Sequence, residues 1–210
     1  MFAVENLACI RAERLLFSHL GFSLQPGSLL LLKGANGVGK TSLIKILTGL
    51  GAPSEGKVTW MGENIAGNFD FRRDMKYIGH KSGVKADCTV EENIAYWARM
   101  YGTTELISAA LQFYDLQKFR HAYAGQLSAG WQRRVALARL IVVPCRMWIL
   151  DEPTNFLDEE AVMLTATLIE TRVTQGGIVV VASHIMNSAI AAHTLYLADF
   201  VPARMQEMAA

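Results

Sequence analysis

The fold of this chain is decided by the stretch Gly34-Ala35-Asn36-Gly37-Val38-Gly39-Lys40-Thr41, which joins an apolar run at 29–33 to a segment with helical spacing at 41–48. The stretch fits the pattern G-x-x-x-x-G-K-[ST], in which glycines let successive backbone N–H groups turn toward an anion. The helix that follows adds its positive N-terminal end. We therefore expect this loop, together with Ser42, to bind the phosphates of a nucleotide, with Lys40 at the β- and γ-phosphates and the Thr41 hydroxyl on Mg²⁺. A glycine-rich turn that arose by chance is the alternative, and its position between a strand and a helix disfavours it.

A second chemical signal lies further along the chain, where an apolar strand at 147–150 ends in two carboxylates, Asp151 and Glu152. Asp151 is placed to hold Mg²⁺ beside bound phosphates. Glu152 leaves the strand one residue later and could orient or deprotonate an attacking water. An acidic junction between a strand and a turn is ordinary in any α/β protein, but the phosphate loop upstream favours the catalytic interpretation.

The order of the predicted elements indicates an α/β fold with a mostly parallel core sheet. Short β patterns dominate the first third of the chain, which we expect to form an antiparallel part, with strands at 2–7, 21–24 and 56–60. Later strands alternate with helices, as is typical of a parallel sheet, and we place them at 75–79, 147–150, 177–183 and 194–197. We predict a single domain over residues 1–210, with the helical block at about 82–143 as an inserted subdomain.

Start and stop signals define the helices of that block. Thr89 and Glu92 have the spacing of a capping box in front of a helix at 93–100, and Thr104 is placed to cap a helix at 105–113. A third helix, at 130–143, ends at Pro144 because proline cannot continue it.

The start of that third helix determines the class of the protein. It reads Leu127-Ser128-Ala129-Gly130-Trp131-Gln132-Arg133-Arg134. Read locally, Ser128 is an N-cap and the two arginines belong to a basic, solvated helix face. However, Leu-Ser-x-Gly at a helix start, 20 residues before the end of the apolar strand, resembles the layout of the ATP-binding cassette (ABC) family. The resemblance extends over residues 4–197 and implies an ABC-type P-loop ATPase.

In that family two copies pack head to tail around two molecules of ATP with Mg²⁺. The resemblance implies that Ser128 and Gly130 contact the ATP held by the partner copy, while residues 155–158 line the seam of the homodimer. His184 sits where the family has a histidine that contacts the γ-phosphate, so the resemblance makes it catalytic together with Lys40 and Glu152. A lone histidine after a strand is otherwise most often structural.

The chain departs from the usual pattern of the family at several positions. His80 stands where the family usually has a glutamine near Mg²⁺, and Ala129 and Trp131 replace a glycine and a glutamine. Arg11 stands near the place of the aromatic residue that stacks on adenine, and its guanidinium could stack instead. A solvated surface arginine is the alternative. The Leu-Ser-Ala-Gly sequence, the two arginines and the His80 loop resemble the haem-exporter ATPase subunits of cytochrome c maturation.

Composition narrows the functional alternatives. The net charge of +1 disfavours a partner that is nucleic acid, and three scattered cysteines disfavour a disulfide framework or a zinc site. The apolar runs are too short to cross a bilayer. The family resemblance implies integral-membrane permease subunits on separate chains, with this chain in a peripheral position on the cytoplasmic face of the inner membrane. Two other functions remain open here: an ATPase subunit for another cargo, and a soluble cassette that acts on nucleic acid or ribosomes.

Overall fold

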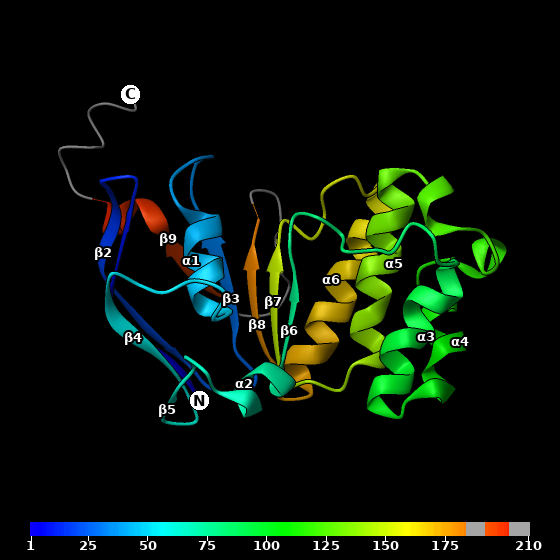
Figure 1. Ribbon diagram of the computed structural model, residues 1–210, viewed down its shortest axis with the longest axis horizontal. Helices are drawn as coiled ribbons and strands as arrows, with labels where there is room; N and C mark the ends of the chain where they lie inside the picture. Colours follow the sequence, from blue (N-terminus) through cyan, green and yellow to red (C-terminus); the bar gives the residue numbers. More distant parts are fainter. Residues whose placement is uncertain (184–191, 202–210) are drawn as a thin grey trace.

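Two β-sheets and a group of helices make up the described part of the computed structural model, which covers residues 1–183 and 192–201. A five-stranded parallel sheet in this part lies between a four-stranded antiparallel sheet on one side and the helices of residues 90–174 on the other (Figure 1). The predicted class, a mostly parallel α/β core with an N-terminal antiparallel part and a helical part, is confirmed.

The parallel sheet supplies the frame for the site. Its strand order is β6-β7-β8-β3-β9, and every neighbouring pair is parallel. The strands are β3 (Leu29–Lys33), β6 (Met75–Ile78), β7 (Met147–Asp151), β8 (Ile178–Ala182) and β9 (His193–Tyr196). All residues of β7 and β8 are buried, because both faces of the sheet are covered.

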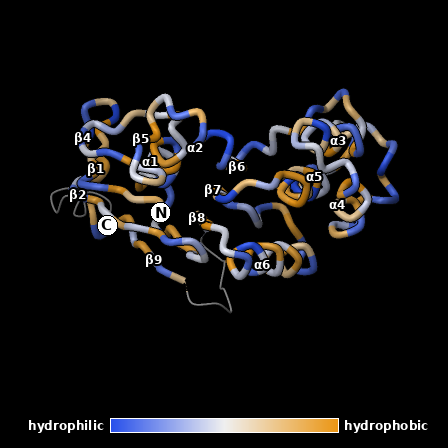
Figure 2. Tube along the Cα trace, turned by 90° about the horizontal axis from the view of Figure 1, so that it is seen from below, coloured by the Kyte–Doolittle hydropathy of each residue, from blue (hydrophilic) through white to orange (hydrophobic). Residues whose placement is uncertain are grey.

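Alternate residues of these strands enter two different hydrophobic clusters. Leu30 and Leu32 pack with helix α1 (Lys40–Leu47) and the antiparallel sheet, whereas Leu29 and Leu31 pack with the helices on the other face. The apolar run before the phosphate loop therefore holds two layers together. In Figure 2 the hydrophobic strand β8 lies in the middle of the molecule, and the helix α5 (Ala129–Val142) lies among the other helices of its layer.

The antiparallel sheet is longer than the sequence predicts. Its order is β2-β1-β4-β5, with β1 (Phe2–Arg11), β2 (Arg14–Leu24), β4 (Glu55–Trp60) and β5 (Glu63–Asn64). The predicted strands at 2–7 and 21–24 are only parts of β1 and β2. Register shifts interrupt the pairing near Asn6 and His19, both of which have positive φ angles. These irregularities break the simple alternation on which the prediction depended.

The helices are α1 (Lys40–Leu47), α2 (Phe69–Asp74), α3 (Val90–Tyr101), α4 (Ile107–Phe113), α5 (Ala129–Val142) and α6 (Glu159–Thr174). Short 3₁₀ turns lie at Thr104–Leu106, Gln117–Phe119, Ala124–Gln126 and Leu197–Phe200. The capping box is confirmed: the Thr89 hydroxyl accepts from the Glu92 N–H, and the Glu92 carboxylate accepts from the Thr89 N–H. No helix among the described residues is long and apolar enough to cross a membrane.

The prediction that Thr104 caps a helix at 105–113 is wrong. Thr104 opens a 3₁₀ turn, and α4 begins only at Ile107. Thr103, the residue before it, is held by α3 and α5 instead, since its N–H donates to the Ala98 carbonyl and its hydroxyl to the Val142 carbonyl. These tertiary bonds determine where the chain turns.

Candidate functional site

The phosphate loop connects the carboxyl end of β3 to the start of α1. Gly37 and Gly39 adopt φ angles of 79° and 114°, which L side chains rarely adopt, so the turn requires glycine at both positions. The first turn of α1 has no acidic residue that would compete for its positive end. The Lys40 ammonium lies within the loop and donates to the carbonyls of Gly34 at 2.6 Å and Ala35 at 3.1 Å. The loop thus concentrates donors at one end of a helix, which suits an anion.

The two carboxylates at the end of β7 face the same cavity. In a continuing strand Asp151 and Glu152 would point to opposite faces, but Glu152 has a φ angle of 47°, which ends the alternation. The Glu152 N–H donates to the Ala182 carbonyl at 2.8 Å, which fixes the turn against β8. Burial raises the pKa of the Asp151 carboxyl, while the positive charges of His80, Arg133 and Lys40 lower it.

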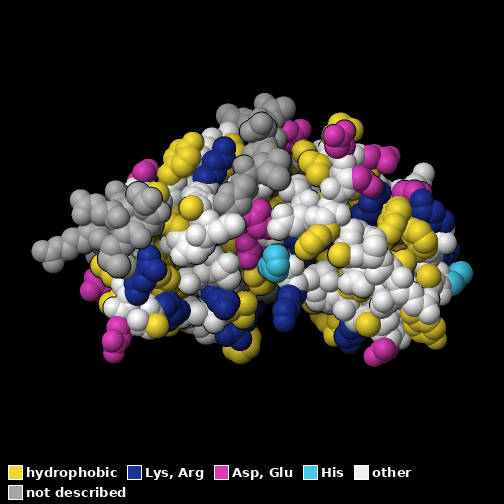
Figure 3. All heavy atoms as spheres, turned by 90° about the horizontal axis from the view of Figure 1, so that it is seen from above, with side chains coloured by type: hydrophobic (Ala, Val, Ile, Leu, Met, Phe, Trp, Pro, Cys, Tyr) yellow, Lys and Arg dark blue, Asp and Glu magenta, His cyan; other side chains and the backbone are white. Residues whose placement is uncertain are grey.

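A cavity of about 540 Å³ brings these parts together. Its walls come from the phosphate loop and α1, from the ends of β6 and β7, and from β2, and they comprise Leu16, Asn36, Gly37, Gly39, Lys40, Thr41, Ser42, His80, Asp151, Glu152 and Asn155. Figure 3 views this edge of the molecule and shows a histidine beside acidic side chains near the middle of the face. Ligand sites lie at the carboxyl edge of open parallel sheets, and this cavity is at that edge.

The donor atoms of the cavity fit Mg²⁺. The Thr41 hydroxyl and the Asp151 carboxylate are hard oxygen ligands, and both line the same cavity. Within the described residues there is no group of three or more His, Cys, Asp or Glu side chains that could hold a metal ion. Beside nucleotides, Mg²⁺ is commonly held by one or two protein oxygens together with phosphate oxygens and water.

A second cavity, of about 370 Å³, lies at the start of α5. One side is formed by Ser128–Trp131 and Arg134, and the other by the segment from Phe156 to Asp158. A methyl group on Gly130 would lie 2.5 Å from the Phe156 carbonyl oxygen, so only glycine permits this contact. Among the described residues, the two cavities have no lining residue in common.

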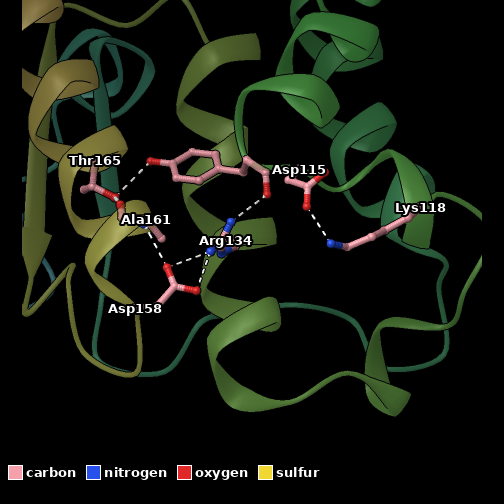
Figure 4. Close-up of polar contacts among 7 residues, drawn as sticks. Asp115, Lys118, Arg134, Asp158, Ala161 and Thr165 are labelled. Atoms are coloured by element: carbon pink, nitrogen blue, oxygen red, sulfur yellow. Dashed lines mark hydrogen bonds and ion pairs between the residues drawn. The ribbon is translucent and has the colours of Figure 1, made fainter.

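Arg134 connects the two sides of the second cavity through hydrogen bonds. Its guanidinium donates to both oxygens of Asp158, at 2.7 and 2.6 Å, and to the Tyr114 carbonyl at 3.2 Å (Figure 4). Asp158 in turn accepts from the Ala161 N–H at 2.9 Å and so caps α6. The Arg134 guanidinium also lies 4.5 Å from the centre of the Trp131 ring. One side chain thereby links the start of α5 to the start of α6.

Some local interpretations are corrected. Arg133 and Arg134 do not form a solvated face, because they are only 3% and 4% exposed. Ser128 occupies the N-cap position of α5, but within the described part of the chain its hydroxyl makes no capping hydrogen bond.

The structure brings together most of the predicted site residues. Arg11 does not line the nucleotide cavity: it is exposed and donates to the Ala52 carbonyl at 3.4 Å, while Leu16 lines the cavity instead. His184 lies outside the described residues. Leu16 was missed because nothing in its local sequence distinguishes it from other aliphatic strand residues.

Comparisons with known proteins agree with this geometry. The family described as "ABC transporter" matches residues 17–155. A "Cytochrome c biogenesis ATP-binding export protein CcmA" of Photobacterium profundum is 39% identical over 199 residues, which cover 88% of this chain and 92% of that protein. A protein of the same name from Vibrio vulnificus is 42% identical over 188 residues, with the same coverage.

Solved structures share the fold. A putative ABC transporter ATP-binding protein from Pyrococcus furiosus superposes with a TM-score of 0.84 at 22% identity, over 96% of this chain and 99% of that one. A dimeric ATP-binding cassette described in a post-hydrolysis state with ADP and Pi gives a TM-score of 0.81 at 22% identity, over 93% and 94% of the two chains. These two structures establish the fold alone.

Proposed function

This chain belongs to the ABC transporter family, and we propose that it is the ATP-hydrolysing subunit of a membrane export complex that serves the biogenesis of c-type cytochromes, with haem as the cargo. The proposal rests on the cavity that unites Lys40, Thr41, Asp151 and Glu152, and on the 39–42% identity to the two CcmA proteins. The relatives reported above give no support to a different cargo or to a clamp that acts on nucleic acid.

Binding of ATP uses the phosphate loop. The backbone N–H groups of residues 35–42 and the end of α1 would receive the phosphates. Lys40 would exchange its bonds to the Gly34 and Ala35 carbonyls for phosphate oxygens. Thr41 and Asp151 would hold Mg²⁺, with His80 beside them, and the bound ion would offset the phosphate charge. Adenine stacking by Arg11 would require its guanidinium to leave the Ala52 carbonyl.

Hydrolysis requires a group that accepts a proton from water, and we assign that role to Glu152. Its carboxylate lines the cavity one residue beyond Asp151, and its left-handed backbone turns it toward the phosphate loop. General-base catalysis of this kind contributes about 10²- to 10⁴-fold to the rate. The family resemblance assigns His184 to the γ-phosphate.

The second cavity supplies the missing side of the nucleotide site. Ser128 and Gly130 line a cavity separate from that of Lys40, so we place them against the ATP bound by another copy of the chain. The positive end of α5 would then face the γ-phosphate of that ATP. In this arrangement the segment from Asn155 to Asp158 lies at the seam of a homodimer.

We further propose that integral-membrane permease subunits on other chains are the partners, and that this chain is peripheral on the cytoplasmic face of the inner membrane. In this proposal residues 1–210 form one ABC domain, in which residues 82–143 are the inserted helical subdomain.

Genetic complementation tests the function. A Vibrio vulnificus strain that lacks its CcmA protein would receive this chain or the Glu152→Gln variant, and covalent haem in its c-type cytochromes would be measured by peroxidase staining. The proposal predicts that the unaltered chain restores the stain and that the variant, at equal abundance, does not. Failure of the unaltered chain, although it is abundant and co-purifies with the membrane subunits, would contradict the cytochrome c assignment.

A further inference from the structure

We propose that Arg133 is a positioning residue for ATP hydrolysis, whose guanidinium holds the carboxyl ends of β6 and β7 in the arrangement that brings His80 and Glu152 to one cavity. The proposal rests on the proposed function and adds to it a residue that does not itself line the nucleotide cavity. It concerns the ATPase step and not the cargo.

Within the described part of the chain, the hydrogen bonds of Arg133 go to main-chain oxygens around the site. Nη2 donates to the carbonyls of Asp151 and Glu152, both at 2.8 Å, and Nε donates to the Pro153 carbonyl at 3.0 Å. Nη1 donates to the Gly79 carbonyl at 2.7 Å. One buried side chain of α5 therefore holds three consecutive peptide groups after β7 and one after β6.

These bonds surround the unusual backbone of Glu152. A left-handed conformation is unfavourable for a residue with a β-carbon and persists only where the surroundings enforce it. The carbonyl of Glu152 and those of both its neighbours accept from the same guanidinium, and its N–H is fixed to Ala182. Without Arg133, the carbonyls would turn to water or to other donors, and the carboxylate would lose its fixed direction.

The fourth bond extends the effect to the neighbouring strand. Gly79 directly precedes His80, which lines the nucleotide cavity. Ser128 and Gly130 lie at the start of the same helix that carries Arg133. Arg133 therefore fixes where the start of α5 lies relative to Glu152 and His80.

The number of acceptors explains why arginine is needed. A guanidinium has five N–H donors in a rigid plane and can serve several carbonyls at once. Lysine has one flexible ammonium, and glutamine has a single NH₂ group. Each replacement leaves some of the four carbonyls without this donor, and glutamine also removes the positive charge beside Asp151.

The test compares full-length Arg133→Gln and Arg133→Lys with the unaltered protein and with Arg172→Gln. Arg172 is a matched control, because it donates to the Cys145 carbonyl near the other end of β7, away from the cavity. For each protein we would measure the melting temperature, the Kd for ATP with Mg²⁺, the fraction of chains that bind nucleotide, and the kcat per binding-competent chain.

We expect Arg133→Gln to keep the Kd within about three-fold and to lower kcat by about 10- to 100-fold, with Arg133→Lys in between. Arg172→Gln should lower the melting temperature but keep kcat. A kcat within about three-fold of the unaltered value in Arg133→Gln would overturn the proposal. A variant that loses only the fraction of chains that bind nucleotide, with an unchanged kcat in the remaining chains, would also overturn the proposal. Failure of both Arg133 variants to fold would do the same, because Arg133 would then be purely structural. If the unaltered protein does not hydrolyse ATP, the proposed function itself fails.

Discussion

The backbone conformation of Glu152 determines where its carboxylate lies. The change of φ from strand values to 47° turns a second carboxylate toward the cavity that Asp151 already lines. Burial raises the pKa of the Asp151 carboxyl, and nearby cations oppose this effect. The two carboxylates thus meet different surroundings, which suits different roles, one at a cation and one at a water molecule.

Replacing Glu152 with Gln tests this division of roles. An amide keeps the shape of the side chain but cannot accept the proton, so turnover should fall by about 100-fold or more while ATP binding remains. Steady-state ATPase assays and nucleotide titration would measure both quantities. Glu63→Gln, an exposed residue of β5, is the matched control and should change neither. Hydrolysis at the unaltered rate in purified Glu152→Gln would remove Glu152 from catalysis.

Gly130 offers a second test at the residue scale. A methyl group there would lie 2.5 Å from the Phe156 carbonyl oxygen, so Gly130→Ala must push the start of α5 away from the segment 155–158. We expect stability to fall by about 1–3 kcal/mol and hydrolysis to fall with little change in ATP affinity. Gly62→Ala is a control for an added methyl group, because nothing lies within 4 Å of its β-carbon position, although its φ of 91° also disfavours alanine. Unchanged hydrolysis in Gly130→Ala would contradict the contact.

Short sequence motifs predicted the residues of this site that bind phosphate or carry the carboxylates, but they did not predict the residues that position them. Lys40, Thr41, Asp151 and Glu152 were predictable because each belongs to a short motif with its own chemistry. Arg133 looked like a surface residue, since its four acceptors come from segments 18 to 54 positions away in the sequence. Such a role depends on tertiary packing and leaves no local pattern.

Among the elements, β6 carries an unexpected charge into the interior. Lys76 is 7% exposed, and its ammonium lies 2.8 Å from the centre of the Trp97 ring of α3. The pKa of Lys76 is lowered from 10.5 to about 7, mainly by burial and to a smaller extent by the nearby charge of Arg139, while Cys145 acts in the opposite direction. The ring face favours the charged form but does not replace the lost hydration.

This pKa makes stability depend on pH. Between pH 7 and about 10 the unfolded chain binds a proton at Lys76 that the folded chain has released, so the free energy of unfolding rises with pH, by up to about 2 kcal/mol from pH 7 to 9. Lys76→Met should be more stable at pH 7 and should lack this part of the rise. Urea unfolding at both pH values would measure it. Lys57→Met, at an exposed site, should keep the rise, and an equal rise in Lys76→Met would exclude Lys76 as its source.

Elements were predicted accurately where their start and end are determined by neighbouring residues in the sequence, and inaccurately where tertiary contacts determine them. The limits of β3 (Leu29–Lys33) matched the apolar run in the sequence, because a continuous apolar stretch bounded by turn residues carries its own start and stop signals. The strands predicted in place of β1 and β2 were too short, because irregular pairing near Asn6 breaks the alternation of buried and exposed residues. The start of α4 was misplaced because bonds from α3 and α5 fix Thr103.

At the scale of the whole molecule, the residues expected to act on one nucleotide lie in two separate cavities. The phosphate loop and the carboxylates line one cavity, while Ser128 and Gly130 line another that shares no residue with it within the described chain. Two copies packed head to tail would complete both sites at once, because a twofold arrangement repeats each contact. In the proposed dimer, a complete ATPase site therefore takes residues from two chains.

Mixing two inactive variants tests whether the site is shared between two chains. Lys40→Ala removes one half of the site and Ser128→Arg blocks the other, so each variant alone should be inactive. Random exchange gives about half mixed dimers, each with one intact composite site of two, and the mixture should recover about a quarter of the unaltered ATPase rate. Differently tagged chains would confirm that mixed dimers form. A mixture that contains these dimers and still hydrolyses no more ATP than either variant alone would contradict the shared site.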